Sequence, residues 1–106
     1  MTALVSRQAT GSCRLNAVWI SMPPGGATAV HHHGPEETVV YLIRGSARIH
    51  SGTDLTAITE QTAGQVVFIP GNCPHQVTAG PEGFDGFEVR SGATDQTTLT
   101  RPTDQN

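Results

Sequence analysis

The 106-residue sequence predicts an all-β fold, and three observations lead to this prediction. No apolar stripe recurs at helical spacing over ten or more residues. Short segments instead alternate apolar and polar residues, or are rich in β-branched and aromatic residues. The 12 glycines and 7 prolines separate these segments at short intervals. Many short strands at near-regular spacing are typical of a β-sandwich or a β-barrel, and closure into a barrel hides the strand edges.

The expected strands follow one another between turn signals. The first covers residues 14–22 and ends at a Pro-Pro-Gly-Gly turn. The others, each bounded by glycine, proline or a polar turn, cover residues 39–43, 47–50, 55–59, 65–69, 76–78 and 84–90. Residues 1–12 are polar and aperiodic and are interpreted as an N-terminal arm. Residues 91–106 form a polar tail, expected to be loose or a short edge strand. A chain of this length forms one domain, residues 1–106.

Composition excludes several classes of function. The net charge is −3, and the six basic residues are scattered arginines, so no basic stripe is present to bind nucleic acid. The absence of lysine excludes Schiff-base catalysis and a P-loop. No apolar run is long enough to span a bilayer, and the N-terminus lacks the apolar centre of a signal peptide. We therefore expect no membrane partner and a cytoplasmic location.

The densest group of possible metal ligands lies in residues 31–37, which hold three histidines and two glutamates. Side chains at positions i and i+2 of a strand point to the same face. His31 and His33 can therefore direct their imidazoles at one point, whereas His32 faces away.

Two further ligands can complete this group. After the turn at residues 34–35, Glu36 or Glu37 can bring a carboxylate back towards the histidines. His75, which lies between a turn and the next strand, is the candidate for the third nitrogen ligand. Three imidazoles and a carboxylate suit one divalent transition-metal ion, with positions left open for water, oxygen or substrate.

The spacing of these residues resembles that of the cupins, a family of small jelly-roll β-barrels built as a double-stranded β-helix. Their first motif reads G, five residues, HxH, three or four residues, E, six residues, G. Gly25, His31, His33 and Glu37 match the first intervals, but seven residues separate Glu37 from Gly45.

The extra residue places Thr38 at the distance from Gly45 where the motif has its carboxylate. Glu37 remains the favoured carboxylate ligand, with Glu36 as the second choice. The resemblance therefore implies a metal site formed by His31, His33, Glu37 and His75.

The second cupin motif reads G, five residues, PxG, two residues, H, three residues, N. Gly64, Pro70 and His75 match it. Asn72 replaces the motif glycine, and asparagine also tolerates a left-handed backbone. Ala79 replaces the final asparagine, which is not a metal ligand in the family. The resemblance covers residues 25–79 and extends through the flanking strands to about residue 90.

Residues that line a substrate pocket are harder to predict, because strand parity does not tell which face is inside. The candidates are Trp19, Tyr41, Phe68, Cys73 and Phe87, for each of which core packing is the alternative role. The hydroxyl of Tyr41 can also serve chemistry, and Glu37 can leave the metal to act as a base. Cys13 and Cys73 are expected to be reduced. Arg90 is expected at the surface, where it can meet an acidic substrate at the end of its strand.

The resemblance implies a metal-dependent fold but no single reaction. The leading hypothesis is an enzyme whose metal ion binds a small oxygenated organic molecule. Iron would support a dioxygenase, whereas zinc, nickel or manganese would act as a Lewis acid in an isomerase or cyclase. The alternatives are a metal-dependent binding or sensor module, and the metal-binding component of a larger enzyme system. A homodimer is expected, since cupins commonly pair through an edge strand.

Overall fold

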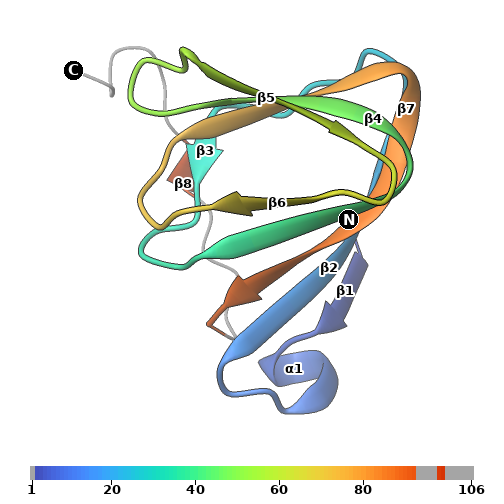
Figure 1. Cartoon of the computed structure of the whole chain (residues 1–106). Helices are drawn as coiled ribbons and strands as arrows, with labels where there is room; N and C mark the ends of the chain where they lie inside the picture. The colour runs from blue at the N-terminus through green and yellow to red at the C-terminus, as the bar shows by residue number, and fades with distance from the viewer. Residues whose placement is uncertain (1, 93–97, 100–106) are drawn as a thin grey trace.

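Antiparallel strands and one short helix make up the part of the chain that the computed structural model describes, residues 2–92 and 98–99 (Figure 1). The all-β prediction is confirmed. The elements are β1 (Thr2–Val5), α1 (Arg7–Thr10), β2 (Leu15–Met22), β3 (His31–His32), β4 (Thr38–Ser51), β5 (Ala57–Thr62), β6 (Val66–Ile69), β7 (His75–Ser91) and β8 (Thr98–Leu99). Among these residues, no helix has the length and apolar character needed to cross a membrane.

Two long strands, β4 and β7, organise the barrel. They pair antiparallel along their whole length, from Thr38 opposite Arg90 to Ser51 opposite His75. Strands β5 and β6 both pair with β4, and β2 and β3 both pair with β7. In Figure 1 both long strands bend sharply, so the two halves of each strand lie in opposite walls of the barrel.

Gly45 bends β4 instead of ending it, which differs from the two separate strands that were predicted on either side of it. Its φ is +83°, and the register with β7 shifts on both sides of it. A Cβ atom at this position would overlap the carbonyl oxygen of Gly83, which is also at positive φ in β7. The two glycines therefore let the paired strands turn together from one wall to the other.

The first twelve residues are more ordered in structure than the expected arm. Strand β1 pairs with β2, with Thr2 opposite Trp19. Helix α1 is closed by local caps: the side chain of Ser6 accepts a hydrogen bond from the Ala9 amide, and Gly11 ends the helix at φ +78°. These capping contacts do not depend on a repeat of apolar residues. A prediction based on apolar spacing therefore does not detect this short helix. In the tail, β8 pairs with β3 at the edge of the sheet; residues 93–97 and 100–106 lie outside the described residues.

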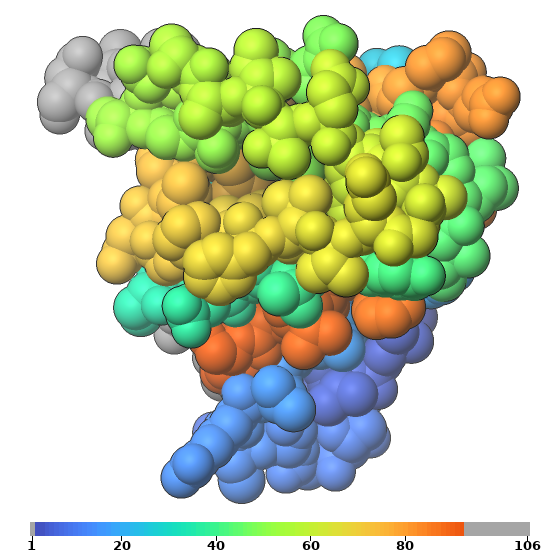
Figure 2. Space-filling view, viewed as in Figure 1, coloured from blue at the N-terminus to red at the C-terminus, as the bar shows by residue number. Residues whose placement is uncertain are grey.

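Alternation along β4 shows which face of the sheet is inside. Thr38, Val40 and Leu42 are buried, whereas Val39 is exposed and Tyr41 is half-buried on the outer face. The core cluster consists of Val40, Leu42, Ala47, Ile69, Ala79 and Phe84. Figure 2 shows β5 and β6 as the front surface of the barrel, with β1, α1 and β2 at its lower end.

Candidate metal centre

The structure brings the three predicted histidines together. His31 of β3 pairs with His75 of β7, and their ring centroids lie 4.3 Å apart. His33 follows two residues later, with its ring centroid 5.0 Å from that of His31 and 5.3 Å from that of His75. One possible ligand atom from each ring lies within 4.8 Å of the other two. An ion with bonds of about 2.1 Å draws its ligands to within about 4.2 Å of one another, so modest ring rotations complete a site.

Backbone carbonyls orient two of the rings. Nδ1 of His31 donates to the carbonyl oxygen of Ala29 at 2.7 Å, and Nδ1 of His75 donates to that of Cys73 at 2.9 Å. A neutral imidazole that carries its hydrogen on Nδ1 has a lone pair on Nε2. Both rings therefore have the tautomer that metal-binding histidines commonly adopt.

Burial keeps the same two rings neutral. It lowers the pKa of His75 to about 4, against the opposing effect of the hydrogen bond to Cys73, and electrostatic interaction with His31, His32 and Arg90 lowers it further. The pKa of His31 is also lowered, mainly by burial. At pH 7 both imidazoles are thus in the unprotonated form that binds a metal ion.

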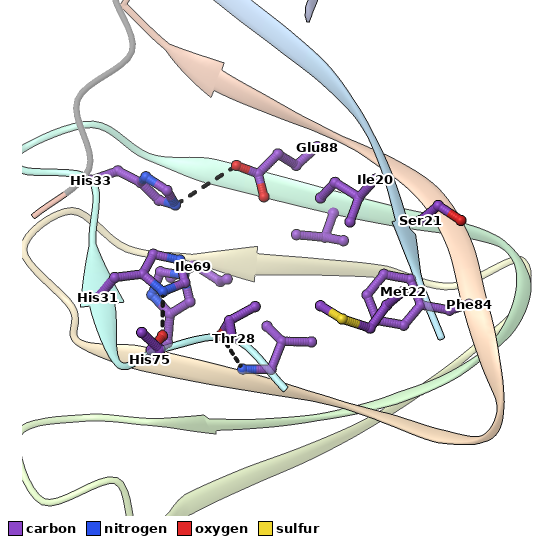
Figure 3. A pocket seen from close by; sticks show the side chains of 13 residues that line it. Ile20, Ser21, Met22, Thr28, His31, His33, Ile69, His75, Phe84 and Glu88 are labelled. Carbon is purple, nitrogen blue, oxygen red and sulfur yellow. Dashed lines mark hydrogen bonds and ion pairs between the residues drawn. The ribbon is translucent and has the colours of Figure 1, made fainter. Parts of the chain in front are cut away.

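His33 is held differently, between Arg90 and Glu88 of β7. Nη1 of Arg90 lies 3.1 Å from Nδ1 of His33, and a guanidinium can only donate. Nδ1 therefore accepts, and a neutral ring carries its hydrogen on Nε2, which lies 3.7 Å from Oε1 of Glu88 (Figure 3). His33 can bind a metal through Nε2 as the other neutral tautomer, with its hydrogen on Nδ1, and this requires the hydrogen bond from Arg90 to be broken. The three imidazoles nevertheless fit a divalent transition metal in the chemistry of their donors.

Arg90 and Glu88 were not predicted as site residues. Arg90 is 1% exposed, not at the surface, and its Nε lies 3.0 Å from Oε1 of Glu88. Residues 88 and 90 lie on the same face of β7 as the buried Phe84, so alternation along this strand could have placed both side chains in the interior. That signal was hidden because the opposite face of β7 carries apolar residues too, including Phe87.

Glu37, the predicted carboxylate ligand, lies outside the group of three histidines in the structure. Its side chain is exposed, and its backbone pairs with Ser91. Thr38 turns inward instead and is 2% exposed. The extra residue before Gly45 therefore has a physical meaning, because it puts threonine at the inward position and glutamate on the outer face. Glu36 is half-buried and also lies outside the histidine group.

The histidines stand at one end of a cavity of about 310 Å³. Figure 3 shows His31, His33 and His75 at this end, with Met22 and Phe84 at the other. The remaining walls are mostly apolar and include Ile20, Val40, Ile69 and Val77, with Glu88 beside His33. The volume is at the lower end of the range for small-molecule sites.

None of the five predicted pocket residues lines this cavity. Trp19, Tyr41 and Phe87 occupy one cross-strand row on the outer face, where the ring centroids of Tyr41 and Phe87 lie 5.6 Å apart. Phe68 is 55% exposed. Cys73 is a free, half-buried thiol that packs against the core. The hydroxyl of Tyr41 is therefore on the wrong side of the sheet for chemistry in the cavity.

An antiparallel β-barrel with a three-histidine group at one end of an internal cavity defines a class of small barrels that can hold a metal ion. The family model described as "Cupin domain" matches residues 18–83. The chain belongs to the cupin family, which confirms the resemblance seen in its motifs. Asn72 at φ +54° has the left-handed backbone expected for the motif glycine that it replaces.

Solved structures support the same fold. A protein of Klebsiella pneumoniae described as having a double-stranded β-helix domain is 21% identical, with a TM-score of 0.78 over 93% of this chain and 81% of that chain. Oxalate decarboxylase from Bacillus subtilis is 25% identical, with a TM-score of 0.81 over 90% of this chain. The chain spans only 26% of that decarboxylase. No curated protein matches the sequence.

Proposed function

We propose that this protein binds one divalent transition-metal ion through His31, His33 and His75 and acts with it on a small oxygenated organic molecule. The observation that carries the proposal is the placement of the three imidazoles at the end of a mostly apolar cavity of about 310 Å³. Iron, zinc, manganese and nickel all accept imidazole ligands. When bound, such an ion would supply activation of dioxygen, if it is iron, or polarisation of a carbonyl.

The cavity walls set the class of molecule that fits. Ile20, Met22 and Phe84 offer an apolar surface to a carbon skeleton and exclude water from the histidine end. Oxygen atoms of the ligand would then face the histidines, where polar groups gather. The likeness to oxalate decarboxylase, at 25% identity, supports a small oxygen-rich molecule as the class of substrate.

The metal is tested by elemental analysis of gently purified protein and by calorimetric titration of the metal-free protein with Zn²⁺ and Mn²⁺. We expect one ion per chain, and a loss of binding in His31→Ala. His32→Ala is the matched control, because His32 lies outside the group and accepts a hydrogen bond from the amide of Gly34. The absence of binding by wild-type protein, or equal binding by both variants, would contradict the proposal.

A binding or sensor module without turnover is the second candidate. It is favoured by the scarcity of acid-base groups, because Glu37 is exposed and Tyr41 faces outward. Besides the histidines, Glu88 is the sole ionisable residue among those that line the cavity, and it is paired with Arg90. Oxygen uptake by iron-loaded protein, or isomerisation by zinc-loaded protein, during a screen of small oxo- and hydroxy-acids would favour the enzyme. Ligand-induced thermal stabilisation without turnover would favour the module.

We also propose that two copies of the chain associate through the outer face of β4 and β6. Val39 opposes Phe68, and Tyr41 opposes Val66, in this strand pair. Val39, Phe68 and Val66 are 38%, 55% and 61% exposed, and a contiguous exposed apolar area of this kind commonly marks an interface. Light scattering should give a dimer that Phe68→Lys converts to a monomer. Ile58→Lys, at an equally exposed site on β5, should leave the dimer intact; a monomeric wild-type protein would refute the proposal.

A further inference from the structure

Glu88 occupies an unusual place for a carboxylate. It is 8% exposed, lines the cavity, and is flanked in register by Val18 of β2 and Val40 of β4. Its Oε1 is 3.0 Å from Nε of Arg90 and 3.7 Å from Nε2 of His33. Placing a charge between two valines is costly, and a buried ion pair is often no more stabilising than apolar residues of similar size. The pair is therefore poorly explained as a device for stability.

The charge of a bound metal ion offers a reason for this carboxylate. An imidazole binds a metal ion as a neutral ligand, so the group of His31, His33 and His75 brings no negative charge to a divalent ion. A carboxylate beside the three imidazoles would offset part of the charge of a cation buried in a mostly apolar cavity. Among the described residues that line the cavity, Glu88 is the sole carboxylate.

Distance also permits Glu88 to share an ion with a histidine. Two ligands of one ion with bonds of about 2.1 Å can be up to about 4.2 Å apart. Oε1 of Glu88 and Nε2 of His33 fall within this limit at 3.7 Å. Glu88 lies outside the group whose ligand atoms are all within 4.8 Å, so binding requires its side chain to turn towards His31 and His75.

We propose that Glu88, delivered by β7, is the carboxylate ligand of the metal centre, in the role that the first motif gives to a glutamate near position 37. The inference rests on the proposed metal function. Strand β4 presents Thr38 to the interior where a carboxylate is expected, and β7 presents Glu88 two residues before Arg90, the residue that pairs with Thr38. The carboxylate has thus moved to the neighbouring strand while the three histidines stay in place.

Calorimetric titration of metal-free protein with Mn²⁺ and Zn²⁺ tests this assignment. Glu88→Gln keeps the size of the side chain and removes its charge, and we expect at least a tenfold loss of affinity. Glu37→Gln makes the same chemical change at an exposed position and should stay within twofold of wild type. Wild-type affinity in Glu88→Gln, with binding lost in His31→Ala, would overturn the role of Glu88 and leave the metal proposal standing.

Glu88→Asp distinguishes metal ligation by Glu88 from the effect of its negative charge alone. It also provides the test if the Glu88→Gln variant does not fold. It keeps the negative charge beside Arg90 but withdraws the carboxylate by one methylene. A ligand role predicts at least a fivefold loss of Mn²⁺ affinity in a variant whose circular dichroism is that of wild type. Unchanged affinity in Glu88→Asp would show that Glu88 supplies only background charge and would refute ligation. A wild-type protein that binds neither ion would instead contradict the proposed function itself.

Discussion

Acidification should destabilise the metal-free protein through His75. In the unfolded chain this imidazole titrates near 6.5, whereas burial lowers its pKa to about 4 in the fold. Between these values the unfolded state binds the proton and the folded state does not, so the free energy of unfolding falls as the pH falls. One pKa unit corresponds to about 1.4 kcal/mol, so His75 alone accounts for a loss of about 3 kcal/mol between pH 7 and pH 4. His31, whose pKa is lowered too, adds to the loss in the same direction.

Urea denaturation in the presence of a chelator, at several pH values from 7 to 4, measures this loss. His75→Gln removes the titrating group. The loss of unfolding free energy between pH 7 and pH 4 should therefore be smaller in this variant than in wild type, by up to about 3 kcal/mol. Arg48→Gln, which disrupts an exposed pair with Glu60, is the control for an unrelated change of charge. Parallel curves for wild type and His75→Gln would show that His75 is not held neutral by burial.

Two further predictions concern the fold. Gly45→Ala should lower the free energy of unfolding by at least about 2 kcal/mol, since its Cβ meets the backbone of Gly83 at a positive φ. Gly64→Ala, also at positive φ but with no atom within 4 Å, should cost about 1 kcal/mol, and equal losses in urea denaturation would argue against the close approach. Phe84→Ala should cost about 3 to 5 kcal/mol because Phe84 is 2% exposed, whereas Phe68→Ala at 55% exposed should cost under 1 kcal/mol if measured in the monomeric state. Similar melting temperatures for these two variants would contradict the assignment of the inner face.

The fold was largely predictable because its signals are local. Turn residues and alternation located most strands. The spacing of the motif residues between Gly25 and His75 identified the cupin family. The sequence prediction divides β4 at Gly45 and β7 at residues 79–83, and both divisions are wrong, because a glycine in a sequence does not reveal whether the chain turns away or bends within a sheet. That distinction depends on the partner strand, where Gly83 provides the matching space.

The positions of the three histidines were predictable from the sequence, but the position of Glu88 beside them was not. His31 and His33 are set by strand parity, and His75 by its motif. Glu88 lies on a strand whose two faces both carry apolar residues, so parity alone could not assign it to the interior. The choice between faces is made by the whole barrel, which encloses one face of β7 and leaves the other outside.

The pairing of β3 with β7 also has a consequence for the order of folding. His31 meets His75 only after the chain has closed a loop of more than forty residues, and the contacts of β4 with β7 span from 24 residues, between Ser51 and His75, to 52 residues, between Thr38 and Arg90. Contacts between such distant residues form slowly, because the entropy of loop closure is lost before the contacts stabilise the chain. A metal ion would therefore find the three histidines together only in molecules whose barrel has formed, and the onset of metal binding during refolding would report when the barrel forms.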